Sequence, residues 1–191
     1  MLERLFISKV RVKILKQYLL NIEAQYHIRE LVRLLNEEIN AVRRELKNLE
    51  AFGLLKSRKQ SNKIIYTLNP NNPFVYELRS MILKDSDELR LMTKVLGAIN
   101  NIDVVLITEA YMTKKYSDEN DIDILILGKP DINKLTKEMN SVEKELGRDL
   151  RMAVLTKEDF EFRKKRREKT ILDVIEKDKI VLLGSPNKIG L

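Results

Sequence analysis

Residues 28–68 read as two short helices with a polar turn between them and a hairpin after them, and this order limits the possible folds more than any other feature. The first helix is predicted within 28–35 after a short extended entry, and the polar turn is Asn36-Glu37-Glu38. The apolar positions of the second helix recur at helical spacing: Ile39, Val42, Leu46 and Leu49. Gly53 then supplies the left-handed residue that commonly ends a helix. With a further helical pattern over 6–20, the sequence predicts a small three-helix domain that carries a hairpin.

The second helix of this pair, predicted over 39–52, carries a polar sector turned away from its apolar stripe. At about 100° per residue, four side chains project together from it: Asn40, Arg43, Arg44 and Lys47. Arginine can pair in bidentate fashion with guanine, asparagine can do so with adenine, and lysine suits phosphate. This sector therefore has the side chains of a helix that reads the major groove of DNA. The alternative is a basic face that only meets solvent.

The hairpin is predicted from two strand-like runs, 54–59 and 63–68, joined by the polar tip Gln60-Ser61-Asn62. Three basic residues lie along or beside this tip: Arg58, Lys59 and Lys63. A hairpin next to a DNA-reading helix reaches the phosphate backbone, so we expect these residues to bind DNA without regard to its sequence.

Together these segments resemble the winged helix domains of small bacterial and archaeal regulators of the ArsR/MarR type. The resemblance is carried by residues 27–35, residues 40–50, the corner Phe52-Gly53-Leu54-Leu55 and the closing Tyr66-Thr67-Leu68-Asn69-Pro70. It implies that the protein binds double-stranded DNA as a homodimer, with two reading helices about one DNA turn apart. The tip of the hairpin departs from the family pattern because it lacks the glycine often found there.

Composition excludes several classes of chemistry. The chain has no cysteine and one histidine, His27, which excludes disulfide frameworks, thiolate chemistry and zinc fingers. Because His27 has no second ligand or acid–base partner nearby in sequence, we expect a structural or surface role for it rather than metal or acid–base work. No stretch approaches the ~18 apolar residues of a membrane span, and the first residues lack a secretory signal. We therefore expect a globular, cytoplasmic protein without membrane association.

The positive charge is concentrated in the first half of the chain. Residues 1–90 hold 17 Lys and Arg against 11 Asp and Glu, which accounts for +6 of the formal net charge of +7. Such an excess suits a phosphate backbone as partner. In the second half, the basic run 163–167 together with Lys169 is either a second nucleic-acid contact or a solvated face of a helix predicted over 160–176.

The second half alternates helical and strand patterns. The two helices predicted at 74–83 and 87–99 form either a connector with a dimer seam or parts of their own domains. Near-continuous apolar runs rich in β-branched residues predict two buried strands, 102–107 and 122–128. A helix at 134–146, a strand at 150–155, the helix at 160–176 and a strand at 179–183 follow.

Asp121 and Asp123 are the candidate metal ligands. Two aspartates at i and i+2 on a strand point to the same face, where their carboxylates could hold Mg²⁺ against a nucleotide triphosphate. With the run Val104-Val105-Leu106-Ile107 before it and a later strand after it, the pair resembles the minimal nucleotidyltransferase domains of the DNA polymerase β superfamily.

This second resemblance fails at the phosphate-binding position. The family has a Gly-Ser pair about a dozen residues before the aspartates, and here that position holds Glu109-Ala110 or, one residue earlier, Thr108-Glu109. A side chain in place of glycine keeps the backbone away from a phosphate, and a glutamate repels it. Asp149 is the sole candidate for the third carboxylate, and Arg151 lies on the face where it would be needed. We therefore expect an impaired site with weak or no binding of Mg²⁺ and nucleotide.

The chain is thus predicted to be α+β, with a winged helix-turn-helix domain over 1–70, a helical connector over 71–100 and a mixed α/β nucleotidyltransferase-like domain over 101–191. The favoured function is a DNA-binding transcriptional regulator whose second domain is no longer an enzyme and serves sensing or dimerisation. Two alternatives stay open. One is an active, antitoxin-like nucleotidyltransferase that modifies a partner protein or a small molecule, and the other is a protein-interaction module.

Overall fold

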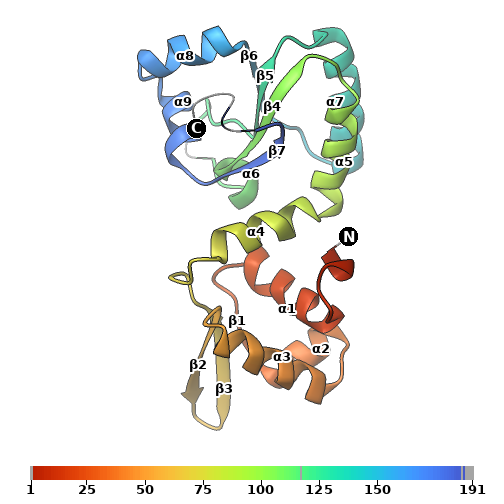
Figure 1. The fold of residues 1–191 in the computed structure, drawn as a ribbon, viewed down its shortest axis with the longest axis vertical. Helices are drawn as coiled ribbons and strands as arrows, with labels where there is room; N and C mark the ends of the chain where they lie inside the picture. The colour runs from red at the N-terminus through yellow and green to blue at the C-terminus, as the bar shows by residue number, and fades with distance from the viewer. Residues whose placement is uncertain (1, 117, 186, 188–191) are drawn as a thin grey trace. The chain divides into compact units, whose positions relative to one another are not determined.

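The computed structural model describes residues 2–116, 118–185 and 187. Its residue contacts divide the chain into two compact units, Met1–Ser86 and Asp87–Leu191, coloured red to yellow and green to blue in Figure 1. The two helices predicted between the domains fall in different units, α4 (Val75–Lys84) in the first and α5 (Asp87–Gly97) in the second. Over the described residues, every helix is too short or too polar to cross a membrane.

The first unit consists of three helices followed by a hairpin and a fourth helix. Its further elements are the 3-10 turn η1 (Leu2–Arg4), α1 (Lys9–Leu20), β1 (Gln25–His27), α2 (Ile28–Leu35), α3 (Ile39–Ala51), β2 (Leu55–Gln60) and β3 (Lys63–Leu68). The strands pair antiparallel in the order β1-β3-β2, and the long hairpin formed by β2 and β3 extends from the unit (Figure 1). This combination of a helix-turn-helix with a three-stranded sheet is a winged helix arrangement, and we call residues 55–68 the wing.

The core of the first unit is formed by the apolar stripes of α1, α2 and α3 against the sheet. Its fully buried members include Ile14, Leu19, Leu31, Val42 and Leu46. The helix predicted over 6–20 begins later, because the Ser8 side chain caps α1 by accepting a hydrogen bond from the backbone N–H of Arg11 (3.2 Å). Gly53 has φ +79°, as expected for the residue after α3.

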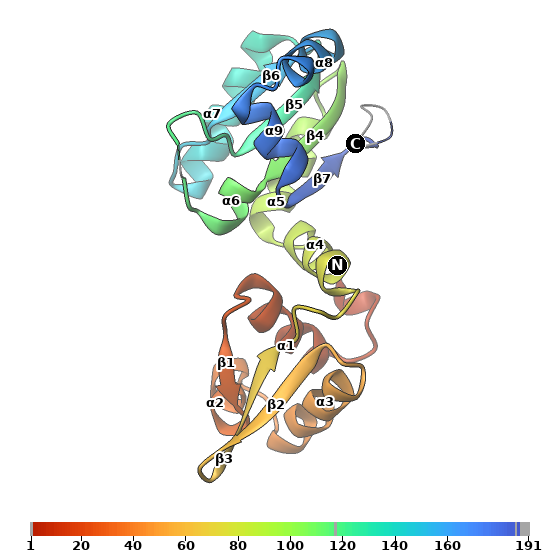
Figure 2. The same ribbon diagram turned by 90° about the vertical axis from the view of Figure 1, so that its left-hand side faces the viewer.

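The second unit is a four-stranded sheet with helices on both faces. After α5 come β4 (Ile102–Thr108), α6 (Glu109–Thr113), β5 (Ile124–Gly128), α7 (Ile132–Leu146), β6 (Met152–Leu155), α8 (Lys157–Lys165), α9 (Lys169–Glu176) and β7 (Lys179–Leu183). The strand order is β6-β5-β4-β7, with β5 and β6 parallel and the other pairs antiparallel. Helices α5 and α7 cover one face of the sheet, and α8 and α9 cover the other (Figures 1 and 2).

The single helix predicted over 160–176 is two helices in the structure. Arg167, between α8 and α9, adopts φ +55°, and the N–H of Glu168 donates to the carbonyl of Arg163 (3.1 Å), a closure typical of a helix end. On either side of this break, Phe160 of α8 and Ile171 and Val174 of α9 are buried against the sheet. The prediction of one continuous helix was wrong because a left-handed non-glycine residue leaves no signal in apolar spacing.

Candidate functional site

The polar sector of α3 is exposed along its whole length. Its four residues, Asn40, Arg43, Arg44 and Lys47, are all solvent-exposed, and we call them the reading face. Arg43 donates from Nη1 to Oδ1 of Asn40 (3.1 Å), so two of the side chains that could contact bases hold each other in place. Within the described part of the chain, no carboxylate forms an ion pair with any residue of the reading face.

The opposite side of α3 is held by a buried ion pair that the sequence analysis missed. Glu45 is 3% exposed, and its Oε2 accepts a hydrogen bond from Nε of Arg11 on α1 (2.8 Å). Burial on its own raises the pKa of Glu45, but the hydrogen bond and charge of Arg11, with hydrogen bonds from Ser8 and Asn48, outweigh it and the pKa is lowered. The burial of Glu45 could have been predicted from the sequence, because this residue lies between Val42 and Leu46 on the apolar stripe of the helix.

His27 has the structural role that we expected. It is the N-cap of α2, where its Nδ1 accepts a hydrogen bond from the N–H of Glu30 (3.1 Å). In return, the Glu30 carboxylate accepts from the N–H of His27 (3.5 Å), which completes a capping box. This reciprocal cap fixes the start of the helix that supports α3.

The wing places its basic residues on two faces. The register pairs Arg58 with Ile65, Lys59 with Ile64 and Gln60 with Lys63, so Arg58 and Lys63 share one face and Lys59 lies on the other. Arg58 donates from Nη2 to Oε1 of Gln25 on β1 (2.7 Å), whereas Lys59 and Lys63 form no ion pair among the described residues.

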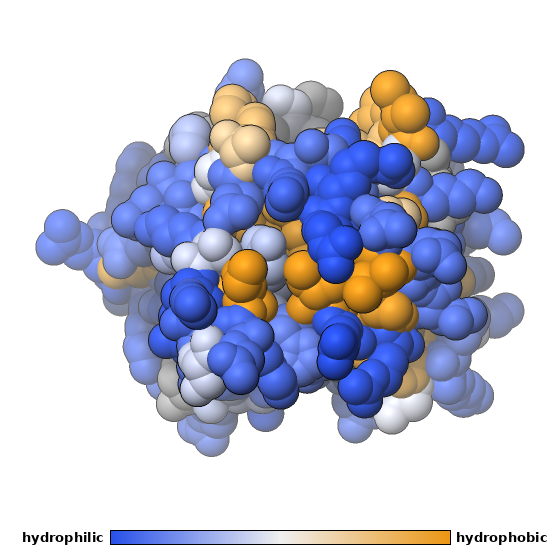
Figure 3. Space-filling model, turned by 90° about the horizontal axis from the view of Figure 1, so that it is seen from below, coloured by the Kyte–Doolittle hydropathy of each residue, from blue (hydrophilic) through white to orange (hydrophobic). Residues whose placement is uncertain are grey.

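The wing and α3 line one groove. Lys63 and Ile64 of the wing face this groove together with Ile39 and Arg43 of α3, and the groove has a volume of about 520 Å³. Figure 3, which views the molecule from the end where the wing and α3 lie, shows a mostly hydrophilic surface with smaller hydrophobic patches. The structure thus brings Lys63 and Arg43, predicted from distant parts of the sequence, to the same groove.

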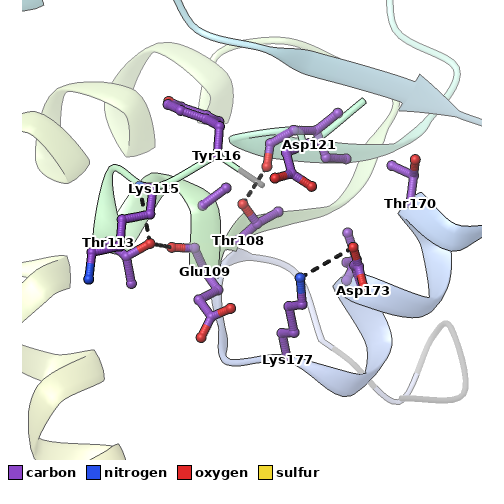
Figure 4. Close-up of a pocket in the computed structure, with 12 residues that line it drawn as sticks. Thr108, Glu109, Thr113, Lys115, Tyr116, Asp121, Thr170, Asp173 and Lys177 are labelled. Carbon is purple, nitrogen blue, oxygen red and sulfur yellow. Dashed lines mark hydrogen bonds and ion pairs between the residues drawn. The ribbon is translucent and has the colours of Figure 1, made fainter. Parts of the chain in front are cut away.

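The second unit contains a cavity of about 360 Å³ at one end of its sheet (Figure 4). Its walls come from the end of β4, α6, the segment before β5 and α9. The charged residues of the lining are Glu109, Lys115, Asp121, Asp173 and Lys177. Lys177 pairs with Asp173 (Nζ to Oδ2, 3.3 Å), so part of this charge is neutralised within the cavity wall.

Asp121 and Asp123 have different surroundings. Both precede β5, which begins at Ile124, and Asp121 lines the cavity (Figure 4). Asp123 is fully buried, and its two oxygens accept hydrogen bonds from the Tyr116 hydroxyl (2.8 Å) and the N–H of Arg151 (2.9 Å). Burial and the neighbouring Asp123 carboxylate raise the pKa of Tyr116, which keeps this hydroxyl protonated as the donor.

The predicted phosphate cradle is occupied by side chains. Thr108, Glu109 and Ala110 all line the cavity, and the Thr108 hydroxyl donates to the carbonyl of Ile122. Among the residues that the structure describes, no group of three or more histidine and carboxylate side chains could hold a metal ion. These donors do not fit the three-carboxylate Mg²⁺ site that the nucleotidyltransferase resemblance implies.

Comparison with known proteins gives limited similarity. No model of a protein family matches the chain. Over 65 residues the chain is 35% identical to an uncharacterized HTH-type transcriptional regulator of Methanocaldococcus jannaschii, an alignment that covers 34% of this chain and 16% of that relative. Among solved structures, it is similar to reduced HlyU from Vibrio cholerae, with 24% identity and a TM-score of 0.33 over 43% of this chain and 78% of that chain. Because this TM-score does not establish a common fold, the winged helix arrangement rests on the strand order and helix positions described above.

Proposed function

We propose that the protein is a transcriptional regulator that binds double-stranded DNA through its first unit. The observation that carries this proposal is the reading face of α3, which exposes three cations and an amide without a carboxylate partner among the described residues. The similarity to an HTH-type transcriptional regulator supports it. In this function α3 lies in the major groove, and the wing follows the phosphate backbone beside it.

The contacts divide into two kinds. Asn40, Arg43 and Arg44 have the donor geometry for base edges, and the hydrogen bond between Asn40 and Arg43 orients both before DNA arrives. Lys47, Lys59 and Lys63, with Arg58 beside them, contact phosphates and fix the position of α3 on the duplex. Two copies of the chain act together, and each copy reads one half-site.

The binding experiment compares the parent with two single variants on genomic fragments, using fluorescence anisotropy. Arg43→Ala or Arg44→Ala weakens specific binding by about 1–3 kcal/mol, or about 5- to 150-fold, if the residue reads a base. Lys134→Ala, which removes an exposed lysine of α7 in the second unit, is the matched control and leaves affinity unchanged. If both arginine variants bind as tightly as the parent, α3 is not the reading helix.

We propose that the second unit is a nucleotidyltransferase-like domain that no longer transfers nucleotides and serves sensing or dimerisation. Glu109 lies where a phosphate-binding backbone would need glycine, and both carboxylate oxygens of Asp123 accept hydrogen bonds from the protein. The test incubates the protein with labelled ATP, CTP, GTP and UTP, Mg²⁺ or Mn²⁺ and cell extract. No label transfer is expected. Transfer that disappears in the Asp121→Asn/Asp123→Asn variant would establish an active enzyme instead.

A further inference from the structure

The first unit carries an apolar groove away from the reading face. It has a volume of about 490 Å³ and lies between α1, the end of α3 and the start of α4. Its apolar lining includes Phe6, Leu15, Leu49, Phe52, Phe74 and Met81. Its charged lining residues are Glu77 and Arg11, and Arg11 is paired with Glu45. An apolar surface of this kind on a small domain marks an interaction site more often than a solvated face.

Specific contacts hold the rim of the groove in place. Phe52 and Phe74 are 52% and 51% exposed, and their rings stack with centroids 5.6 Å apart at 27°. Asn72 holds the backbone of both: its Nδ2 donates to the carbonyl of Phe52 (3.2 Å), and its Oδ1 accepts from the N–H of Phe74 (3.0 Å). One amide therefore holds two aromatic residues in positions where their rings are exposed to water. This exposure is unfavourable, and a bound partner would remove it.

The same unit also presents an apolar projection next to the groove. Ile7 is fully exposed and Leu5 is 66% exposed, on either side of Phe6, which lines the groove. The residues flanking them, Arg4 and Lys9, are basic and exposed. No ion pair within the described residues involves Arg4, Lys9 or Glu77. The projection is thus apolar between basic residues. The groove is apolar and carries the acidic Glu77, because the charge of its basic residue Arg11 is neutralised by Glu45.

We propose that the groove is the docking site for a second copy of the chain, with Ile7 of each copy in the groove of the other. This deepens the proposed function, because it names the surface that forms the homodimer. Two features support a second copy over an unrelated partner. The projection and the groove adjoin one another, so a two-fold axis between them satisfies both copies at once, and Lys9 and Arg4 of one copy complement Glu77 of the other in charge.

The first test measures the self-association of the full chain by sedimentation equilibrium. The parent is expected to be dimeric, and Ile7→Glu and the double variant Phe52→Ser/Phe74→Ser are each expected to raise the dimer Kd at least tenfold. Ile132→Glu changes another exposed isoleucine (55% exposed), on α7 of the second unit, and leaves the dimer Kd unchanged. A monomeric parent, or an Ile7→Glu variant that dimerises like the parent, would overturn the proposal. Either result would also be found if the second unit of the same chain, and not a second copy, covers the groove.

A charge-reversal experiment tests the pairing without disturbing the core. Lys9→Glu and Glu77→Lys each replace an exposed residue, and each is expected to weaken the dimer severalfold because like charges then face one another. The combined Lys9→Glu/Glu77→Lys variant is expected to recover the parent Kd. If the combined variant is weaker than either single variant, the two residues do not meet across the interface.

DNA binding separates this inference from the proposed function. Monomeric Ile7→Glu is expected to bind a single half-site as the parent does, and to lose at least tenfold in affinity on a fragment with two half-sites. A parent that dimerises through the groove but binds no DNA would refute the regulator and leave the docking site standing. A variant that stays as tight as the parent on two half-sites would refute the docking site.

Discussion

The two units differ in how the positive charges at their candidate sites are paired. In the first, the cations of the reading face and Lys59 and Lys63 of the wing have no carboxylate partner among the described residues. In the second, several charges pair within the unit: Lys177 pairs with Asp173 in the cavity wall, and Lys169 pairs with Asp118 (2.6 Å). The Lys169 ammonium lowers the pKa of that Asp118 carboxyl to about 2.

This difference indicates where an anionic partner can be accommodated. A phosphate that approaches the reading face displaces only water and counterions, because no internal ion pair has to break first. A phosphate that approaches the cavity competes with Asp173 for Lys177, and it meets Glu109 and Asp121 as well. The reading face and the wing therefore leave their cations open to an external anion, whereas the charge of the cavity wall is partly neutralised by the pair of Lys177 and Asp173.

The ion pair of Arg11 with the buried Glu45 gives the largest expected effect. Arg11→Met leaves the Glu45 carboxylate buried without its partner and should lower the free energy of unfolding by about 3 kcal/mol. The control is Lys13→Met, which breaks the more exposed pair of Lys13 and Glu37 and should cost no more than about 1 kcal/mol. Urea unfolding followed by circular dichroism measures both, and equal losses would show that burial does not distinguish the two pairs.

The same pair should make the stability of the first unit depend on pH. Because the pKa of Glu45 is lower in the folded state than its ordinary value of 4.5, the pair stabilises fully above pH 4.5. That stabilisation is lost as the pH falls below 4.5 and through the folded pKa. Glu45→Gln should flatten the fall in urea midpoint between pH 6 and pH 3. A variant as acid-sensitive as the parent would assign the dependence to other carboxyls.

Salt dependence compares a lysine of each unit directly. Lys63→Ala should reduce the slope of log K against log salt for DNA binding by about 0.9, the value for one phosphate contact on duplex DNA. Lys177→Ala removes a lysine that Asp173 already neutralises, and should leave the slope unchanged. Titrations from 50 to 200 mM salt give both slopes. If the two variants behave alike, the contrast between the units does not extend to DNA binding.

The smallest expected effect concerns the wing tip, where the missing glycine has a structural consequence. Ser61 adopts φ +52° in the two-residue turn between β2 and β3. Ser61→Gly relieves this left-handed strain but loosens the unfolded chain, with a net gain of about 0.5 kcal/mol. Asn62→Gly, at a residue outside the positive-φ region, should lower stability instead. Thermal unfolding checks both signs.

Much of the first unit could be predicted from its sequence because its signals are local. Apolar spacing marked α2 and α3, Gly53 marked the end of α3, and all seven predicted DNA-binding residues are exposed in the structure. Contacts between distant residues left no such signal. Arg11 and Glu45 lie 34 positions apart, and nothing in either local pattern indicates that they meet.

The surroundings of Asp121 and Asp123 in the second unit could not be predicted from the sequence for the same reason. The strand around the aspartates begins at Ile124, so the alternation that predicts a common face for Asp121 and Asp123 does not apply there. Their surroundings are set by Tyr116 and Arg151, which reach Asp123 from a loop and from the residue before β6. Such pairings depend on tertiary structure and not on spacing.

Asn72 joins two parts of the first unit that otherwise have separate tasks. Its amide ties Phe52, the C-cap of α3, to Phe74, the N-cap of α4, so the reading helix and the apolar groove share one corner. If this corner couples the proposed groove contact to DNA binding, the factor by which one changes the affinity of the other must be the same in both directions. Asn72, distant in sequence from the reading face, would then be the side chain through which the first unit links its two surfaces.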